Sequence, residues 1–323
     1  MRGRNKKRLR TQGKRSKRLA KRLLKEPENR GRLDLWREYA HLEWLLGNLE
    51  EARKVFDTAL GLGVARGLKD PALCQLCLLY AQLEMEEAWQ AGEGRSLAGT
   101  SPATSPAVHI LTKLAEEATY TPFSGQVAPV AILKARKSYE QAVEACLAGL
   151  ETGRFKKAQH VAGLVGCYSL FQYLTVGVDA ANVIYRQARE RLDQQASMTL
   201  QNSGVDSSSA NANSSSANAI SISITADCEA LAVQQAALLR HHTNTSVFPL
   251  GHLRGALTSA LTHFSTSAPL WHLYLQAEAR YHSAGRARRF FHSVMKGGQS
   301  VVPHLFAIWA EQGRKELLDS VQR

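Results

Sequence analysis

The sequence predicts an all-α fold, an α-solenoid of stacked helical hairpins with a disordered insert. Apolar residues follow helical spacing in paired segments that short turns connect. One set of large and small residues also recurs at the same offsets in two distant parts of the chain, which is typical of a repeat architecture. The chain has 323 residues and 44% hydrophobic content, enough to bury a sizeable core.

The best-defined hairpin lies at residues 33–60. Its first helix carries large residues at helical spacing, and Gly47 is expected to end that helix because glycine adopts a positive φ at little cost. A second apolar stripe follows immediately, so the connection is too short for anything but an antiparallel pair. The residues that define the pattern are Trp36, Tyr39, Glu43, Ala52, Arg53 and Phe56.

The same pattern returns more than two hundred residues later, in the same order and at the same spacing. The glycine is the one departure, since Gly285 stands 14 residues after Trp271, whereas Gly47 stands 11 residues after Trp36. This recurrence indicates a packing pattern rather than a single site. The second set is Trp271, Tyr274, Glu278, Ala287, Arg288 and Phe291.

Weaker copies fill the space between these two. One pairs Tyr168 with Tyr185, and another is split, with its first helix around Tyr80 and its second around Tyr139. The split predicts an insert near residues 90–130, made of a flexible loop and one helix. Residues 227–242 and 249–264 form a further candidate pair.

The positive charge is concentrated at the N-terminus. Residues 1–25 contain thirteen Lys or Arg and no acid, whereas the rest of the chain carries equal numbers of basic and acidic groups. Such a run is typical of a nuclear-import signal or a polyanion-binding patch, and equally of a solvated basic helix leading into a fold. Both interpretations stay open. The candidate residues are Lys6, Lys7, Arg8, Arg10, Lys14, Arg15, Lys17, Arg18, Lys21 and Arg22.

A stretch rich in Ser and Asn separates two helical regions. Residues 195–225 lack aromatic side chains and offer little apolar surface to offset the entropy of ordering, so we predict a disordered linker. The predicted organisation is therefore a basic arm (1–25), a first repeat region (26–194), the linker (195–225) and further repeats (226–323).

The Trp-Tyr-Glu and Ala-Arg-aromatic pattern resembles the half-a-tetratricopeptide, or HAT, repeat. That resemblance implies stacked antiparallel helix pairs that act as scaffolds in RNA-processing assemblies. It also implies that the Glu and Arg are structural. We therefore expect polar contacts within each repeat, Glu43 with Arg53 and Glu278 with Arg288.

A closer resemblance is carried by segments such as "RLLKEPENRGRLDLWREYAHLEWLLGNLEEARKVFDTALG" and "GQVAPVAILKARKSYEQA". They are similar to the C-terminal half of the nuclear RNAi-defective-two family, also called the nuclear exosome regulator. The resemblance implies a nuclear protein that associates with the exosome's RNA helicase, restrains RNA decay, and connects to splicing and small-RNA silencing. It also implies that the helicase-binding region is absent and that the sequence is truncated at both ends.

No catalytic motif is found by sequence. Phosphate-binding glycine loops, HExxH and GxSxG are absent, so we expect no enzyme and no cofactor. Cys74 and Cys77 form a lone CxxC in an apolar helical run, and we predict buried small hydrophobes rather than a metal site. An odd number of cysteines in a long chain favours a reducing compartment, and no apolar run is long enough to span a membrane.

Three hypotheses for function follow. The first is a nuclear protein–protein scaffold in RNA surveillance, with protein partners and no membrane. The second is a direct RNA-binding protein that uses the basic arm, through phosphate contacts because no aromatic residue lies in the arm to stack on bases. The third is an enzyme, for which no motif argues.

Overall fold

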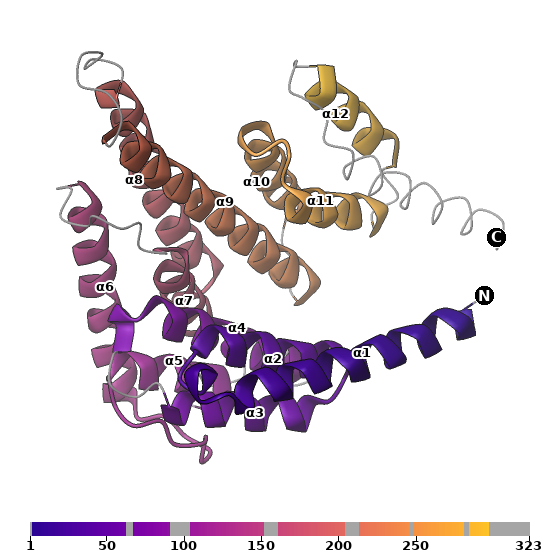
Figure 1. Cartoon of the computed structure of the whole chain (residues 1–323). Coiled ribbons are helices and arrows are strands. Elements are labelled where there is room, and N and C mark those ends of the chain that lie inside the picture. The colour runs from indigo at the N-terminus through magenta and orange to yellow at the C-terminus, as the bar shows by residue number, and fades with distance from the viewer. Residues whose placement is uncertain are drawn as a thin grey trace. The chain divides into compact units, whose positions relative to one another are not determined.

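The computed structural model describes residues 2–62, 67–90, 104–151, 161–203, 213–245, 249–280 and 284–296. Within these residues the protein contains twelve α-helices and no strand, which confirms the predicted all-α fold (Figure 1). The helices are α1 (Arg2–Lys25), α2 (Leu33–Leu45), α3 (Leu49–Leu62), α4 (Pro71–Gln90), α5 (Pro106–Ala115), α6 (Pro129–Glu151), α7 (Val161–Thr175), α8 (Val178–Ser203), α9 (Asn213–Thr245), α10 (Leu250–His263), α11 (Ala268–Arg280) and α12 (Ala284–Lys296). Short 3₁₀ turns lie at Pro27–Asn29 and Gly67–Lys69.

The chain forms two compact units, 1–191 and 192–323. In the first unit, α2 and α3 form the predicted hairpin. Gly47 ends α2 with φ of 77°, and the amides of Gly47 and Asn48 donate to the carbonyls of Trp44 and Glu43, at 2.8 and 2.9 Å. These two bonds satisfy carbonyls that the end of a helix leaves without partners, so glycine at this position sets the turn.

Helix α4 lies at the centre of the first unit. It packs against α2 and α3 on one side and against α5 and α7 on the other, while α6 packs against both α5 and α7. Its side chains are buried on several faces, which explains why its sequence is apolar all round rather than striped.

The predicted insert contributes to this unit. Helix α5 lies between α4 and α6, and residues 117–128, called the strap below, follow it without regular structure. Tyr120 of the strap donates its hydroxyl to Asp57 at 3.0 Å, and a ring nitrogen of His109 lies 2.7 Å from the Thr121 carbonyl oxygen. The strap is therefore held against the helices; residues 91–103 of the predicted insert lie outside the described residues.

The second unit contains the later candidate pairs. Helix α9 packs against α10 and α11, and α11 packs against α12. The segments 227–242 and 249–264, predicted as a pair, lie in α9 and α10. Trp271 and Tyr274 are among the largest fully buried side chains of the protein.

The predicted linker differs from the structure. Helix α8 continues to Ser203 and α9 begins at Asn213, so much of 195–225 is helical; residues 204–212 lie outside the described residues. The reason is cooperativity, because extending an established helix costs far less than nucleating one. Helix α9 is anchored by buried Leu231 and Ala232, and its Ser-rich first part extends that anchored segment.

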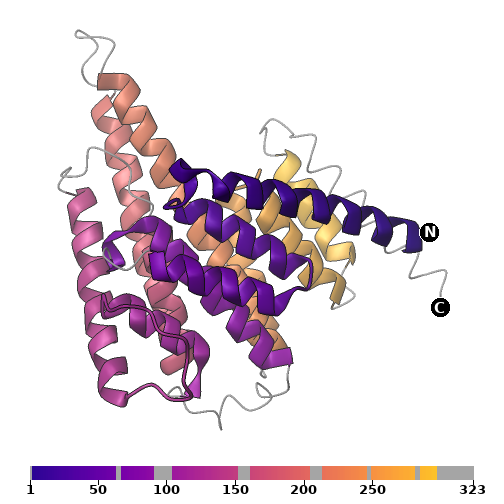
Figure 2. The same ribbon diagram turned by 60° about the horizontal axis from the view of Figure 1, so that its bottom comes forward.

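The basic segment also differs from a free arm. Helix α1 packs along α2 as part of the first unit, and Figure 2 shows it lying against the neighbouring helices. Leu24 is buried, and Gly13 lies close to Leu46, where a larger residue would collide with that side chain. The side chains of Lys6, Lys7, Arg8 and Arg10 lie outside the described residues.

Candidate protein interaction surface

The two defining tryptophans make the same hydrogen bond. The indole nitrogen of Trp36 donates to the carbonyl of Arg30 at 2.9 Å, and that of Trp271 donates to the carbonyl of Ser265 at 2.7 Å. In both cases the acceptor lies six residues earlier, in the turn before the helix. Each tryptophan therefore links its helix to the turn that precedes the hairpin. The two differ in burial, because Trp36 is half-buried and Trp271 is 1% exposed.

Three glutamates, each four residues after a tyrosine, are buried, and each pairs with a cation from the preceding helix. Glu43 of α2 is 2.7 Å from Lys17 of α1. Glu84 of α4 accepts two bonds from Arg53 of α3, at 2.7 and 2.9 Å. Glu278 of α11 accepts two bonds from Arg254 of α10, at 2.8 and 2.9 Å. We call these three ion pairs the latches.

The expected pairs within one repeat are wrong. Glu43 pairs with Lys17 rather than Arg53, and Glu278 pairs with Arg254, while Arg288 is exposed. The physical reason is the direction of packing. The second helix of one hairpin packs against the first helix of the next, so its arginine reaches the following glutamate.

The Glu43 carboxylate is held in the ionised form by its hydrogen bonds. Burial by itself raises the pKa of Glu43, but hydrogen bonds from Lys17, Asn48 and Tyr39 outweigh it, and the pKa lies below its usual value. The pKa of Arg53 is raised, first of all by its hydrogen bond to Glu84. Removing the cation from such a pair leaves a buried charge without compensation.

Aromatic rings complete the same contacts in the first unit. Phe56 stacks on Tyr80 with ring centroids 4.6 Å apart, and Tyr139 stacks on Tyr168 at 5.7 Å. Ala52 beside Phe56 is fully buried, which lets the helices approach closely. In the second unit the aromatic contact joins the two helices of one hairpin, α11 and α12. Phe291 lies edge-on to Trp271 with ring centroids 5.3 Å apart, and Ala287 is buried.

The repeat pattern predicts Glu84 at the position of Glu43, four residues after a tyrosine, but not its pairing with Arg53. The sequence analysis also missed Lys17 and Arg254 as latch partners. A signal for Arg254 was present, because it precedes an apolar stripe as Arg53 does. Lys17 was grouped with its neighbours in a charge run, and only the packing of α1 on α2 separates it from them.

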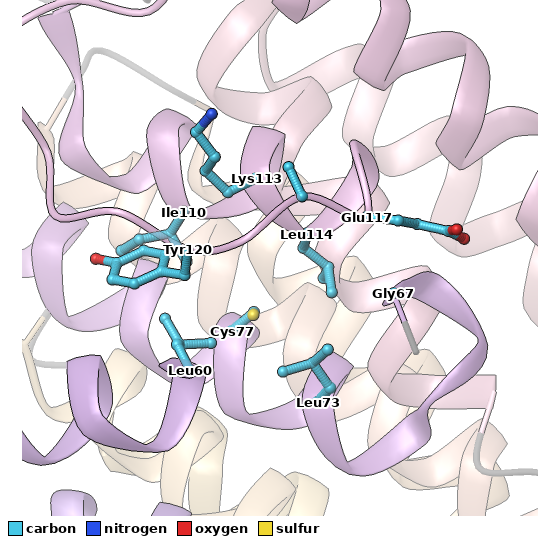
Figure 3. Close-up of a pocket in the computed structure, with 10 residues that line it drawn as sticks. Leu60, Gly67, Leu73, Cys77, Ile110, Lys113, Leu114, Glu117 and Tyr120 are labelled. Atoms are coloured by element: carbon cyan, nitrogen blue, oxygen red, sulfur yellow. The ribbon is translucent and has the colours of Figure 1, made fainter. Parts of the chain in front are cut away.

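A small hollow and a larger one lie among the described residues of the first unit. The small one, of about 20 Å³, lies beneath the strap and is walled by Leu60, Leu73, Cys77 and Leu114, with the charged ends of Lys113 and Glu117 at its edge (Figure 3). It has room for about one water molecule. The larger hollow, of about 780 Å³, lies between α4, α5, α6 and α7 and is bordered by Ser138 and Cys146.

The cysteines of α4 are buried, as predicted. Cys74 and Cys77 are almost fully shielded, and burial raises the pKa of the Cys77 thiol, which keeps it unreactive. Within the described part of the chain, no group of three His, Cys, Asp or Glu side chains is arranged to hold a metal ion. None of the described helices is both long and apolar enough to span a membrane.

Comparison with known proteins gives two close relatives. The chain is 46% identical over 322 residues, 99% of its length, to the human protein named nuclear exosome regulator NRDE2, and 46% identical over 321 residues to the mouse protein of the same name. It spans about a quarter of those relatives, 26% of each. No family model and no solved structure matches the chain. The predicted likeness to the nuclear RNAi-defective-two family is therefore confirmed, since nearly the whole chain is similar to one part of the nuclear exosome regulators.

Proposed function

We propose that this chain is a non-enzymatic scaffold segment that acts in the nucleus and holds protein partners of nuclear RNA decay. The observation that carries the proposal is the 46% identity, over nearly the whole chain, to proteins named nuclear exosome regulators. The latches support it, because each joins one helix to the next by an ion pair. The outward-facing sides of these helices are therefore held in a fixed orientation for a partner to bind.

The proposal extends to the partners that the family likeness implies. These are splicing factors and the exosome's RNA helicase, although the family's helicase-binding region lies outside the part that this chain resembles, with effects on RNA decay, splicing and small-RNA silencing. Because the chain spans about a quarter of its relatives, each of these partners is proposed for this segment and needs its own test.

The test is co-purification from nuclei. The tagged chain is isolated from nuclear extract after ribonuclease treatment, and exosome subunits and the helicase are quantified by mass spectrometry. We expect exosome-associated proteins to be enriched over a tag-only control, and enrichment to fall in a variant that breaks a latch, Arg53→Glu. Recovery equal to the tag-only control for every such protein would overturn the scaffold proposal.

Direct RNA binding by the basic segment is the second candidate function. Lys14, Arg18, Lys21 and Lys25 are exposed on α1, which supports contact with a polyanion. Titrating single-stranded RNA at several salt concentrations tests it. A phosphate-binding α1 gives affinity that falls steeply with salt, and a slope that flattens in the Lys14→Gln/Arg18→Gln/Lys21→Gln variant.

A further inference from the structure

A hollow of the second unit, between α9 and α11, is bordered by two arginines. Its volume is about 200 Å³, and Arg240 of α9 and Arg280 of α11 both line it. The other residues that line it are Thr243, Asn244, Leu253, Gln276 and Ala277. Among these described residues none carries a carboxylate. We call this hollow the arginine pocket.

The segment of chain that forms the arginine pocket is strongly basic. Residues 230–310 contain seven Lys or Arg and a single acid, Glu278. Glu278 is 1% exposed and both of its carboxylate oxygens accept bonds from Arg254, so it does not neutralise the pocket. The carbonyl ends of α9 and α11 contribute about half a negative charge each, which the two arginines outweigh. The pocket is therefore suited to an anion.

Hydrogen-bond donors reach the arginine pocket from two helices. Arg240 and Asn244 lie one turn apart on α9, and Gln276 and Arg280 lie one turn apart on α11. The guanidinium of Arg240 donates to the side-chain oxygen of Gln276, so the Gln276 amide presents its nitrogen, a donor, to other acceptors. This bond uses one of the five N–H donors of the Arg240 guanidinium. The pocket therefore combines two guanidinium groups with amide donors.

A phosphomonoester matches this set of donors. It carries a charge of about −1.5 to −2 at pH 7 and three acceptor oxygens, and arginine binds such a group through parallel hydrogen bonds. The volume of the pocket lies below the roughly 300–1,000 Å³ of pockets for drug-sized ligands, so it suits one small group. RNA matches less well, because no Phe, Tyr or Trp side chain is exposed in the described part of the second unit to stack on a base.

We infer that the arginine pocket binds the phosphoryl group of a phosphorylated Ser or Thr in a protein partner. Arg240 and Arg280 bind the phosphoryl oxygens from two sides, and the Gln276 amide donates a further bond. Leu253 and Ala277 offer apolar surface to the carbon atoms beside the phosphate. The inference rests on the proposed scaffold role and names the chemistry of one partner, a segment that binds only after phosphorylation.

The experiment uses the full chain and three labelled probes. The first is a nine-residue peptide of Ala and Gly with phosphoserine at its centre. The second is the same peptide with serine in that place, and the third is a 20-nucleotide single-stranded uridine RNA. Affinities are measured by fluorescence anisotropy at near-physiological salt, and unlabelled inorganic phosphate is added as a competitor.

Three variants test the arginine pocket. Arg240→Gln and Arg280→Gln each remove one cation, and Arg280→Lys keeps the charge but lacks the planar fork that binds two oxygens at once. The matched control is Arg289→Gln on α12, because that arginine is exposed in the same unit and does not line the pocket. Thermal melts check that each variant keeps the wild-type fold.

We expect the phosphopeptide to bind at least about ten-fold more tightly than the serine peptide, and inorganic phosphate to displace it. Each Gln variant of the pocket should weaken it about ten-fold, Arg280→Lys should weaken it less, and Arg289→Gln should leave it unchanged. Equal binding of the two peptides, no binding of the phosphopeptide, or equal effects of the pocket and control variants would each overturn the inference.

The RNA probe and co-purification separate the remaining alternatives. If the pocket variants weaken RNA binding as much as they weaken phosphopeptide binding, the pocket takes any phosphate and the inference is wrong. RNA binding that these variants leave unchanged belongs to another surface and agrees with the inference. Failed phosphopeptide binding, together with exosome proteins that still co-purify with the wild-type chain, would overturn the inference and leave the scaffold proposal standing.

Discussion

At the scale of single residues, the two tryptophans have equal roles but unequal burial. Both donate an indole hydrogen bond to a carbonyl six residues earlier, yet only Trp271 is enclosed by neighbouring rings, those of Tyr274, Phe290 and Phe291. Removing the more closely packed side chain, that of Trp271, should therefore cost more stability than removing that of Trp36.

Trp271→Ala should lower the free energy of unfolding by about 3–5 kcal/mol, because it opens a large cavity and leaves the Ser265 carbonyl without its donor. Trp36→Ala should cost clearly less, since that side chain is half-buried. Urea denaturation measures both. Equal losses for the two variants would contradict this explanation.

Arg53 should contribute more to the free energy of unfolding than is usual for a partly exposed side chain. Arg53→Ala leaves the buried Glu84 carboxylate unpaired and should cost about 3 kcal/mol, and Arg53→Lys should recover only part because lysine lacks the two-pronged geometry. The control is Lys54→Ala, an exposed neighbour 3.5 Å from Glu51, which should change stability by less than about 0.5 kcal/mol. A loss for Arg53→Ala no larger than for the control would show that the latch is not needed.

His241 should make the stability of the second unit depend on pH. Burial lowers its pKa to about 4, with smaller contributions from His242 and Arg240. Between pH 6.5 and 4 the unfolded chain binds a proton at this site and the folded chain does not, so this contribution is present above pH 6.5 and is lost as pH falls toward 4.

The measurement is urea denaturation at a series of pH values. His241→Gln should flatten the fall in stability between pH 6.5 and 4, whereas His263→Gln, at an exposed position of the same unit, should leave it as in the wild type. An unchanged pH dependence in His241→Gln would refute this assignment.

At the scale of helices, the α1–α2, α3–α4 and α10–α11 contacts each contain a latch. The α6–α7 contact departs from this pattern. Tyr139 stacks on Tyr168 as Phe56 does on Tyr80, but Gln172 stands where Glu84 stands in the earlier contact. The Nε of Arg136 and the Oε1 of Gln172 are both buried without a hydrogen-bond partner.

Gln172→Glu should therefore stabilise the first unit, by roughly 1–2 kcal/mol, because Arg136 occupies the position of Arg53 and would gain a charged acceptor. The same change combined with Arg136→Ala should destabilise, since the new carboxylate would then be buried alone. Thermal melts of the single and double variants decide the matter. A loss of stability in the single variant would mean that the two side chains do not face each other.

At the scale of the whole molecule, the two compact units contain separate latches. Arg53 and its partners Glu50 and Glu84 lie in residues 1–191, and Arg254 and Glu278 lie in residues 192–323. Energetic effects in the two sets should therefore be independent.

The double variant Arg53→Ala/Arg254→Ala should lose the sum of the two single losses, to within about 0.5 kcal/mol. Calorimetric unfolding resolves the contribution of each unit, with each single variant shifting the transition of its own unit. A coupling energy well above that limit would indicate that the units unfold as one cooperative body.

The sequence by itself determined the all-α class, the hairpin turn at Gly47 and the recurrence of Trp, Tyr and Glu, but not the helical parts of residues 195–225. These properties depend on local periodicity and on one residue's backbone preference, both of which are present in a linear pattern. It also determined the burial of Cys74 and Cys77, because an apolar run of that length places them inside a helix packed on several faces.

Only the tertiary structure decided which cation reaches each glutamate. Ion pairing between helices depends on which layer packs next, so Glu43 meets Lys17 and Glu84 meets Arg53, although Arg53 is closer to Glu43 in the sequence. The same packing turned one lysine of a uniform basic run inward and left its neighbours outward. The sequence of a basic run does not show which side chains will be buried and which exposed. In α1 the packing against α2 decides this.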